Sequence, residues 1–369
     1  MNLIILDRNL DALGAVSVFK TLIWERRYYA PGLFELHAAA EFFELMNAGK
    51  YLYRNDRDEL GVILEVNYSR DAKGVRTACC KGYFAEALLN DRVLDAQICL
   101  TGSPERIGRY LVQHLVMEPA DPDRKIPGIT LGQVNHIGTS ITVTATGDKL
   151  GDKLYDIERT QEQSHRLRYD YLTNELRFEV WEGKDRTDTQ TENSWAIFSD
   201  RFRNVKNAIY DRDESNSKNV AYVAGEGEGA DRTIVQVDLR RSADEARREL
   251  YVDARDLKST YTDEDGAEHT YAPDQYRALL RQRGLEKLAE YEKIETVSSD
   301  IDPTANLTYR VDFDLGDLCT FRLTDVGIEA TKRITEIREV YEGNKQTLSV
   351  VFGNDQITSI TKIIQREVL

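Results

Sequence analysis

The chain has 369 residues, which is more than one ordinary domain holds and fits two or three. Its net charge of −15, from 49 basic and 64 acidic residues, opposes broad binding to nucleic acid or to an anionic membrane. No stretch approaches the roughly 18 to 20 apolar residues of a membrane helix, so we expect no stable membrane insertion. The four cysteines lack metal-ligand spacing and are expected to be reduced thiols.

The first hundred residues are predicted to be mostly strand with one short helix. β-branched and aromatic residues on both sides of Pro31 and Gly32 predict a hairpin over 22–38. The segment AAAEFFELMNAG then predicts a helix over 39–47, which ends at Gly49. Three further strands are expected, over 51–54, 61–68 and 75–82.

The sequence pattern changes from strand-like to helical near residue 101. Ser103 and Pro104 form an N-cap and first-turn pair ahead of apolar residues at helical spacing. A strand, ITVTAT, and a helix with an apolar face at Leu150, Leu154 and Ile157 follow. Alternating apolar residues on either side of Thr173 and Asn174 predict a hairpin packed on that helix.

Strands are expected again over 204–210 and 219–224, and we read residues 204–224 as a long hairpin. The longest helix is predicted over 274–295, and the last sixty residues return to strands.

A weak internal repeat relates a segment near the amino end of the chain to one near the carboxyl end. The segments GVILEVNYSRDAKGVRTACCKG (61–82) and KRITEIREVYEGNKQTLSVVFG (332–353) are both predicted hairpins of similar length. Identical or similar residues recur at a constant spacing, with Ile63, Glu65, Val66 and Gly82 matching Ile334, Glu336, Ile337 and Gly353. The order of elements around the two hairpins also agrees, which favours two related β-barrels in one chain.

The stretch NVAYVAGEGEGADRT (219–233) resembles a phosphate loop at first sight. Glu226 and Glu228 lie between its glycines, and the next segment alternates like a strand instead of starting a helix. Two carboxylates would repel a phosphate, so we interpret the glycines as a strand end that needs positive φ or close backbone approach.

No residue pattern predicts catalysis, a cofactor or a metal. The five histidines are scattered without HExxH spacing and are expected at the surface or half-buried; they are His37, His114, His136, His165 and His269. Asp263 to Gly266 resemble part of a calcium loop, but a closing glutamate is missing, so a solvated turn is preferred. The charge-dense segment from Arg247 to Glu249 is left open between a solvated face and a subunit contact.

Several segments taken together resemble a family of siphovirus tail proteins, similar to the baseplate or tail hub of tailed bacteriophages and prophages. They occur in the same order as in that family: GKDRT from Gly183, IFS from Ile197, KNVAYVAGEGEG from Lys218, RRELYVDARDL from Arg247 and DLGDLCTF from Asp314. The resemblance extends from WERRYYAPGLFEL to ITEIREVYEG and so covers most of the chain.

The resemblance implies a homotrimer in which each subunit contributes two tube-like barrels, so that a threefold object presents six modules to a sixfold tail. We therefore expect a β-rich α+β protein. Barrel one would span 1–100, barrel two 195–236 and 297–369, and a peripheral α+β domain 101–194 and 237–296. Implied partners are the tail tube or distal tail protein, the tape-measure protein, and a tail fibre or spike. The implied location is the virion tail tip. Because the protein is strongly acidic, we also expect it to line a channel through which DNA passes without specific binding.

Two other functions stay open at the level of sequence. A cell-wall or polysaccharide hydrolase would need two carboxylates at a defined separation in a cleft. A receptor-binding or carbohydrate-binding module would expose an aromatic platform, whereas the spacing of five tyrosines is typical of a core: Tyr155, Tyr169, Tyr171, Tyr251 and Tyr276.

Overall fold

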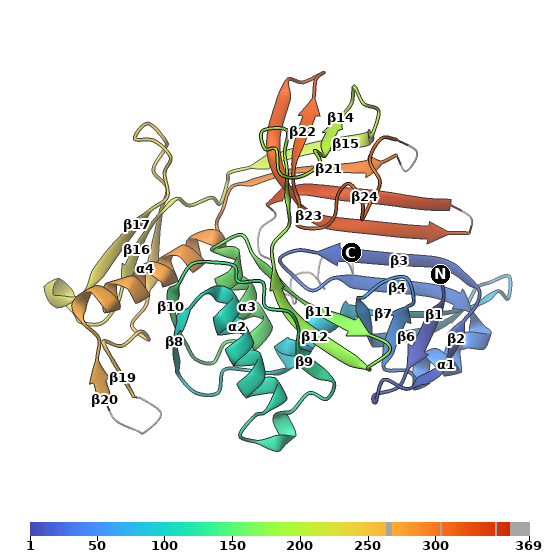
Figure 1. The fold of residues 1–369 in the computed structure, drawn as a ribbon, viewed down its shortest axis with the longest axis horizontal. Helices are drawn as coiled ribbons and strands as arrows, with labels where there is room; N and C mark the ends of the chain where they lie inside the picture. Colours follow the sequence, from blue (N-terminus) through green and yellow to red (C-terminus); the bar gives the residue numbers. More distant parts are fainter. Residues whose placement is uncertain (263–267, 303–304, 344, 355–369) are drawn as a thin grey trace.

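A computed structural model describes residues 1–262, 268–302, 305–343 and 345–354 (Figure 1). The amino-terminal part forms the front sheet, drawn in blue in Figure 1, which carries one short helix, α1 (Phe43–Ala48). Its strands are β1 (Leu3–Leu6), β2 (Ala12–Val16), β3 (Phe19–Arg27), β4 (Leu33–Ala39), β5 (Tyr51–Arg54), β6 (Leu60–Arg70) and β7 (Arg76–Phe84). The strands predicted for this part are confirmed. The helix predicted over 39–47 is shorter, because β4 runs to Ala39 and a 3₁₀ turn (Ala40–Phe42) precedes α1.

The rear sheet is built from two separated parts of the chain. Its strands are β13 (Asp185–Arg186), β14 (Ile197–Ser199), β15 (Val205–Asp213), β21 (Ile294–Ile301), β22 (Leu318–Leu323), β23 (Ile328–Glu342) and β24 (Lys345–Asn354). The front and rear sheets are continuous, because β3 pairs antiparallel with β23 from Thr21↔Glu342 to Arg27↔Glu336. The strand order along this path is β15-β21-β24-β23-β3-β4-β7-β6-β5-β1-β2.

The two sheets share one topology. Five strands of the front sheet follow the order β3-β4-β7-β6-β5, and five of the rear sheet follow β15-β21-β24-β23-β22. Each long hairpin also carries a register shift at the same point of its repeat, between Ile63 and Glu65 in β6 and between Ile334 and Glu336 in β23. β-bulges are local features that bend a strand at a defined position, so a matching pair supports the kinship of the two halves.

Closed barrels are not what the strand pairing shows. Among the described residues neither half closes on itself, because β3 pairs with β23 of the other half and the path ends at β15 and β2. The expected pair of barrels is therefore seen as two related open sheets joined edge to edge. Residues 355–369, assigned to barrel two, lie outside the described residues.

The first inserted segment follows β7 and packs against β5 and the start of β6. It contains β8 (Ile98–Gly102), α2 (Pro104–Val112), β9 (Ile129–Leu131), β10 (Ile141–Ala145), α3 (Leu150–Arg159), β11 (Ser164–Asp170) and β12 (Glu175–Trp181). The predicted cap is present, since the Ser103 hydroxyl accepts from the Arg106 amide at 3.3 Å. Leu150, Leu154 and Ile157 are buried with Leu60 and Val62 of β6 in one apolar core.

The second inserted segment lies at the left of Figure 1. It contains β16 (Val220–Ala224), β17 (Ile234–Asp238), β18 (Glu249–Asp253), β19 (Thr260–Thr262), β20 (Glu268–Thr270) and α4 (Pro273–Ala289). The predicted hairpin over 204–224 is wrong: β15 pairs with β21, while β16 lies between β17 and β18. The physical reason is that β16 is almost wholly buried and needs two neighbouring strands and the cover of α4.

The predicted division into domains stays a prediction. The two inserted segments do touch each other, with α4 against β10 and α3 and a buried ion pair from Lys153 to Glu286 at 2.6 Å. β16 and β17, expected in barrel two, lie outside the large sheet. Among the described residues no helix has both the length and the apolar character to cross a bilayer.

Candidate assembly face and the charge cluster beneath it

One face of the joined sheets is polar and the other is apolar. Along β4, Phe34, Leu36 and Ala38 are buried, whereas Glu35 and His37 between them are half-buried. The same alternation runs across the seam into β24, where Leu348, Val350 and Phe352 are buried. Paired residues of antiparallel strands point to the same side of a sheet. The apolar core of the front sheet, with Phe34 and Leu36, and that of the rear sheet, with Val350 and Phe352, therefore lie on the same side of the joined sheets.

We call the opposite surface the open face. It comprises Thr21, Ile23, Glu25, Arg27, Leu33, Glu35, His37, Glu65, Asn67, Thr77, Cys79, Lys81, Thr296, Ser298, Asp300, Glu336, Arg338, Val340, Glu342, Lys345, Thr347, Ser349 and Val351. All of these except Glu25 are half-buried or exposed. Carboxylates and cations alternate on it, as in the ion pairs Lys81–Glu65 at 3.2 Å and Arg338–Glu25 at 3.6 Å. A sheet face of mixed charge such as this one can contact water, an ion or a polar partner.

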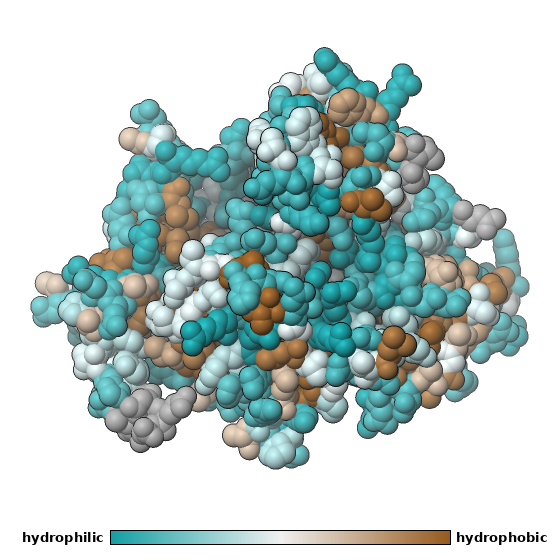
Figure 2. Space-filling view, in the orientation of Figure 1, coloured by the Kyte–Doolittle hydropathy of each residue, from teal (hydrophilic) through white to brown (hydrophobic). Residues whose placement is uncertain are grey.

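The surface seen in Figure 2 is also mostly hydrophilic. Its hydrophobic residues form small separate groups, with no broad apolar area on that side. Several exposed hydrophobic residues are single, such as Leu172 in the turn between β11 and β12 and Trp195 before β14. Single exposed residues of this kind are normal for a folded protein and do not mark a site.

Under the seam, a charge cluster separates the two apolar cores. The guanidinium of Arg54, at the end of β5, is 1% exposed and contacts Glu339 of β23 at 3.2 Å and the Tyr341 hydroxyl at 2.6 Å. Arg57 reaches the same carboxylate at 2.6 Å. Glu339 is completely buried, so two arginines of the front sheet neutralise one carboxylate of the rear sheet.

A second part of the charge cluster continues along the seam. Arg26 of β3 contacts Glu59 and Asp314 at 2.5 Å each, and Arg310 contacts Glu59 at 2.9 Å. The Trp24 indole N–H also donates to Glu59 at 3.4 Å. Arg26–Asp314 and Arg310–Glu59 thus connect the front and rear halves, which helps to fix the relative position of the two sheets.

The electrostatics of the cluster favour the charged state of its carboxyls. Burial alone would raise the pKa of Glu339, but the hydrogen bond from Arg57 and the charge of Arg54 outweigh it and hold the pKa below its usual range. Burial also opposes ionisation of Asp314, and the nearby charges of Arg26 and Arg310 lower its pKa despite it. These carboxylates are fixed counter-ions, not proton donors poised near neutral pH.

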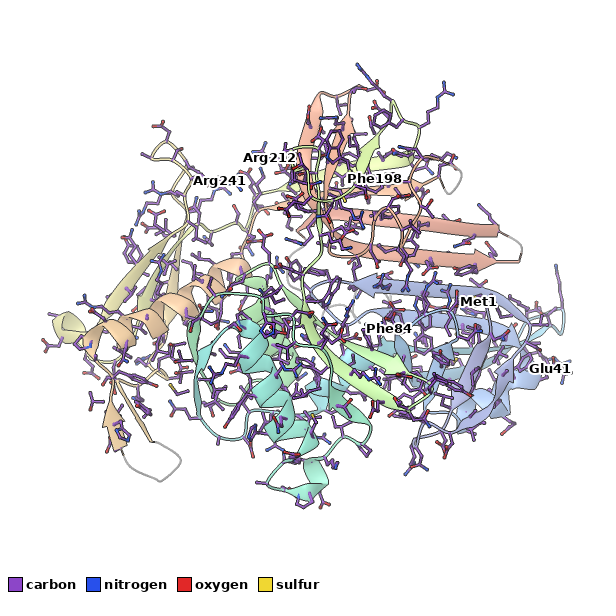
Figure 3. All side chains as sticks on the ribbon, viewed as in Figure 1. Met1, Glu41, Phe84, Phe198, Arg212 and Arg241 are labelled. Atoms are coloured by element: carbon purple, nitrogen blue, oxygen red, sulfur yellow. The ribbon has the colours of Figure 1, made fainter. Side chains whose placement is uncertain are left out.

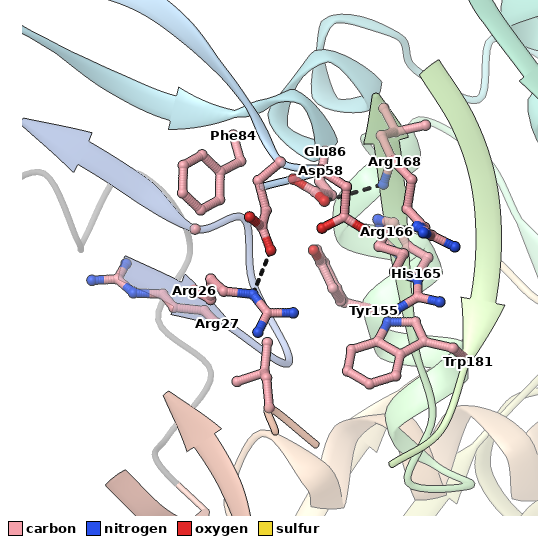
Figure 4. Close-up of a pocket in the computed structure, with 14 residues that line it drawn as sticks. Arg26, Arg27, Asp58, Phe84, Glu86, Tyr155, His165, Arg166, Arg168 and Trp181 are labelled. Atoms are coloured by element: carbon pink, nitrogen blue, oxygen red, sulfur yellow. Dashed lines mark hydrogen bonds and ion pairs between the residues drawn. The ribbon is translucent and has the colours of Figure 1, made fainter. Parts of the chain in front are cut away.

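A small cavity lies beside the charge cluster, under β11 and β12 (Figure 4). Its volume of about 30 Å³ leaves room for roughly one water molecule and none for a sugar ring. Two of its carboxylates are held by arginines, Glu59 by Arg26 and Asp58 by Arg168, along the dashed lines in Figure 4. This cavity therefore lacks the free pair of carboxylates that glycoside hydrolysis needs.

His165 corrects the expectation that the histidines are exposed or half-buried. It is 3% exposed, and its Nδ1 lies 2.8 Å from Glu158, itself completely buried. Among the described residues, His165 Nε2 and Glu86 Oε2 have no hydrogen-bond partner in the protein. Both residues line the small cavity, where water is the available partner for these atoms.

Three metal-ligating side chains meet on the open face. Glu35 and His37 lie on β4, and Cys79 is the cross-strand partner of His37 on β7. Their donor atoms all lie within 4.8 Å of one another. Burial, followed by the charge of Glu35, raises the pKa of the Cys79 thiol to about 11. Sequence spacing could not reveal this group, because 42 positions separate the histidine from the cysteine.

A polar groove of about 720 Å³ separates the rear sheet from the second inserted segment. Arg212 and Arg241, labelled in Figure 3, both line it. Much of its charge is neutralised locally, as in the pairs of Glu214 with Arg212 at 2.5 Å and with Arg248 at 3.3 Å. A polar segment of another protein would fit the groove, but it would have to compete with these ion pairs for the charged side chains.

The glycine stretch is a crowded strand end, as interpreted from the sequence. Gly227 has φ of 100°, and a Cβ at Gly225 would lie 2.4 Å from the Tyr276 hydroxyl. That hydroxyl accepts from the Glu226 amide at 2.8 Å, so the loop is closed by its own chain. The carboxylate of Glu226 accepts from Ser259, which leaves no phosphate cradle.

Other predicted features have mixed outcomes. Tyr155, Tyr169 and Tyr276 are buried as expected, but Tyr171 is 43% and Tyr251 60% exposed. The prediction was wrong for these two, because Tyr171 lies in the turn after β11, and Tyr251 lies on the exposed face of β18, whose alternation is the same as that of a buried strand. Arg247 and Glu249 are exposed in the single chain, which fits both a solvated face and a subunit contact. The segment Asp263 to Gly266, which resembles part of a calcium loop, lies outside the described residues.

Comparison with models of protein families identifies the family of the chain. The family model of the siphovirus ReqiPepy6 Gp37-like protein matches residues 2–354. The chain belongs to this siphovirus family. The match confirms the resemblance predicted from the sequence, whereas no curated protein matches significantly.

Solved structures show that the Gp37-like chain shares its fold with tail proteins of phages and prophages. A tail protein from Neisseria meningitidis MC58 has a TM-score of 0.56 at 12% identity, covering 93% of this chain and 94% of its own. The 43 kDa tail protein of prophage MuSo2 from Shewanella oneidensis has a TM-score of 0.57 at 12% sequence identity, and the match covers 95% of this chain and 98% of that protein. Prophage tail protein gp18 from Listeria monocytogenes EGD-e has a TM-score of 0.54 at 11% identity, and the match covers 100% of this chain and 98% of that protein.

Proposed function

We propose that this Gp37-like protein is the hub of a phage tail, a homotrimer at the tail tip that joins the tail tube or distal tail protein to a spike or fibre. The observation that carries the proposal is the repetition of one strand order in two sheets joined through β3 and β23. Three copies of such a chain present six related sheets, which matches a threefold part to a sixfold tube.

In this arrangement the open face lines the channel of the trimer. It is polar on both sheets and continuous across the seam. Beside it, the first inserted segment covers β5 and the start of β6, where Tyr51, Tyr53 and Val62 are buried in a core of their own. The carboxylates of the open face only slightly outnumber its cations, so DNA would pass with weak, non-specific contacts. The tape-measure protein would occupy the same channel before DNA is released.

The oligomeric state and the orientation are tested together. Light scattering of the purified chain should give three times the chain mass, and electron microscopy should show rings with six lobes in end view. Spin labels on noncanonical side chains should give shorter distances between copies at Thr347, on the open face, than at Leu172, in the exposed turn between β11 and β12. A monomer at micromolar concentration, or the reverse order of distances, contradicts the proposal.

We also propose that the role is structural and not enzymatic. The arginine-paired carboxylates of the charge cluster support this, since a glycosidase acid must keep a proton near neutral pH. The purified protein should leave peptidoglycan and capsular polysaccharide intact. Clearing of either substrate that is lost on Glu59→Gln would instead establish the hydrolase alternative.

A further inference from the structure

Three side chains of different chemistry converge on one point of the open face. Glu35 and His37 are two residues apart on β4 and therefore point to the same side, and Cys79 lies directly opposite His37 on β7. His37 Nε2 is the shared centre, since it contacts the Glu35 carboxylate and lies 3.8 Å from Cys79 Sγ. We propose that Glu35, His37 and Cys79 form a three-ligand Zn²⁺ site with its fourth position open to solvent.

The distances fit a tetrahedral ion with small adjustments. Zn–S and Zn–N bonds of about 2.3 and 2.0 Å place the two donor atoms roughly 3.5 Å apart at a tetrahedral angle. The observed 3.8 Å between Cys79 Sγ and His37 Nε2 is already close to this value. The hydrogen bond between His37 and Glu35 must open so that the ion replaces the shared proton, and both side chains are about one third exposed and have room to turn.

The donor set selects Zn²⁺ or a similar transition metal over Ca²⁺ and Mg²⁺. Thiolate and imidazole are ligands of borderline and soft ions, whereas the hard ions require oxygen ligands. Lys81 is the cross-strand partner of Glu35, but it forms an ion pair with Glu65 at 3.2 Å. Glu35 and the Cys79 thiolate would then neutralise the two charges of the ion.

The strands around the three ligands are held firmly, which favours a preformed site. β4 pairs with β7 over seven consecutive residues, from Leu33↔Tyr83 to Ala39↔Thr77. The neighbours of the ligands along each strand, Leu36, Ala38 and Cys80, are completely buried in the front core. The backbone positions of the ligands are thus fixed by packing, and the ion clips β4 to β7.

Metal titration of the purified, chelator-stripped protein tests the site. We expect one Zn²⁺ per chain, and with Co²⁺ a thiolate-to-metal charge-transfer band together with the visible bands of tetrahedral cobalt. Cys79→Ser and His37→Ala should each weaken binding by about 100-fold or more, because loss of an outer partner alone costs about 10- to 100-fold. Cys99→Ser and His114→Ala are matched controls, since both residues lie outside the front sheet, and they should bind like the parent protein.

The result that overturns the site is equally direct. A parent protein that binds no more tightly than the double variant His37→Ala and Cys79→Ser, or a Co²⁺ complex without the thiolate band, rules it out. The cobalt spectrum needs only the parent protein, so it decides the question even if a variant fails to fold. Binding is measured at the level of the single chain, and a failure of the hub proposal would leave this test unaffected.

Discussion

The buried carboxylate of Glu339 gives the sharpest test of the seam between the two sheets. Glu339→Ala removes the buried carboxylate that Arg54 and Arg57 both contact across the seam, at 3.2 and 2.6 Å. Arg54 is 1% exposed and would keep as its counter-ion the half-exposed Asp56, at 2.8 Å, which Arg57 also contacts. The variant therefore leaves a buried cation partly uncompensated at the contact of the two halves.

Removing one partner of a buried pair typically costs about 3–5 kcal/mol. We expect the upper part of this range, because the substitution breaks contacts to two arginines and to Tyr341 at once. The double variant Arg54→Met and Glu339→Leu should recover part of the loss, since apolar replacement of both partners removes the unpaired charge.

Urea unfolding followed by tryptophan fluorescence measures this loss, because Trp24 is completely buried and its ring lies 5.7 Å from the Arg54 guanidinium. Glu342→Ala, on the same strand but exposed, is the matched control and should stay within about 0.5 kcal/mol of the parent. The folded pKa of Glu339 is lowered, so its contribution is present above the unfolded pKa of about 4.3 and fades as pH falls below it. A loss at pH 7 no larger than that of Glu342→Ala refutes the reasoning.

Two further predictions concern other parts of the molecule. Burial raises the pKa of Asp156 to about 7 against the opposing charge of Lys153, so stability falls as pH rises from the unfolded pKa of about 3.9 to the folded pKa, and the loss is complete above it. Asp156→Asn should then stabilise the protein by roughly 1–3 kcal/mol at pH 8 and by much less at pH 5, and equal gains at both values would contradict this. Gly82→Ala would place a Cβ 1.9 Å from the Val62 carbonyl oxygen at the bulge of β6, and thermal unfolding should show a loss of about 2–4 kcal/mol. An unchanged melting temperature would mean that the bulge adjusts freely.

The sequence predicted local elements well where turn residues and period agreed. The hairpin of β3 and β4 is bounded by Pro31 and Gly32, and the cap of α2 by Ser103, so each could be placed without knowledge of the fold. The repeat between 61–82 and 332–353 was a correct guide to the long hairpins, and the shared strand order of the two halves extends it.

Long-range pairing is what the sequence could not supply. The alternation of Val220 to Ala224 is equally compatible with pairing to β15 or to β17, and only the cover of α4 decides between them. The seam is another case, because nothing local to Arg54 indicates that its counter-ion is Glu339, at a separation of 285 positions. The convergence of His37 and Cys79 likewise depends on a strand register that the sequence leaves undefined.

The way the second inserted segment joins the rear sheet has a consequence for how such proteins diversify. The segment leaves the sheet after Asp213 and re-enters it at Ile294, and these two residues are direct neighbours in the β15–β21 ladder. Exit and return therefore occupy the place of an ordinary hairpin loop, whose length costs little in closure entropy. The whole segment between Asp213 and Ile294 can therefore be replaced, in evolution or by design, with a tight turn or with another domain. The pairing register of β15 and β21 would stay the same.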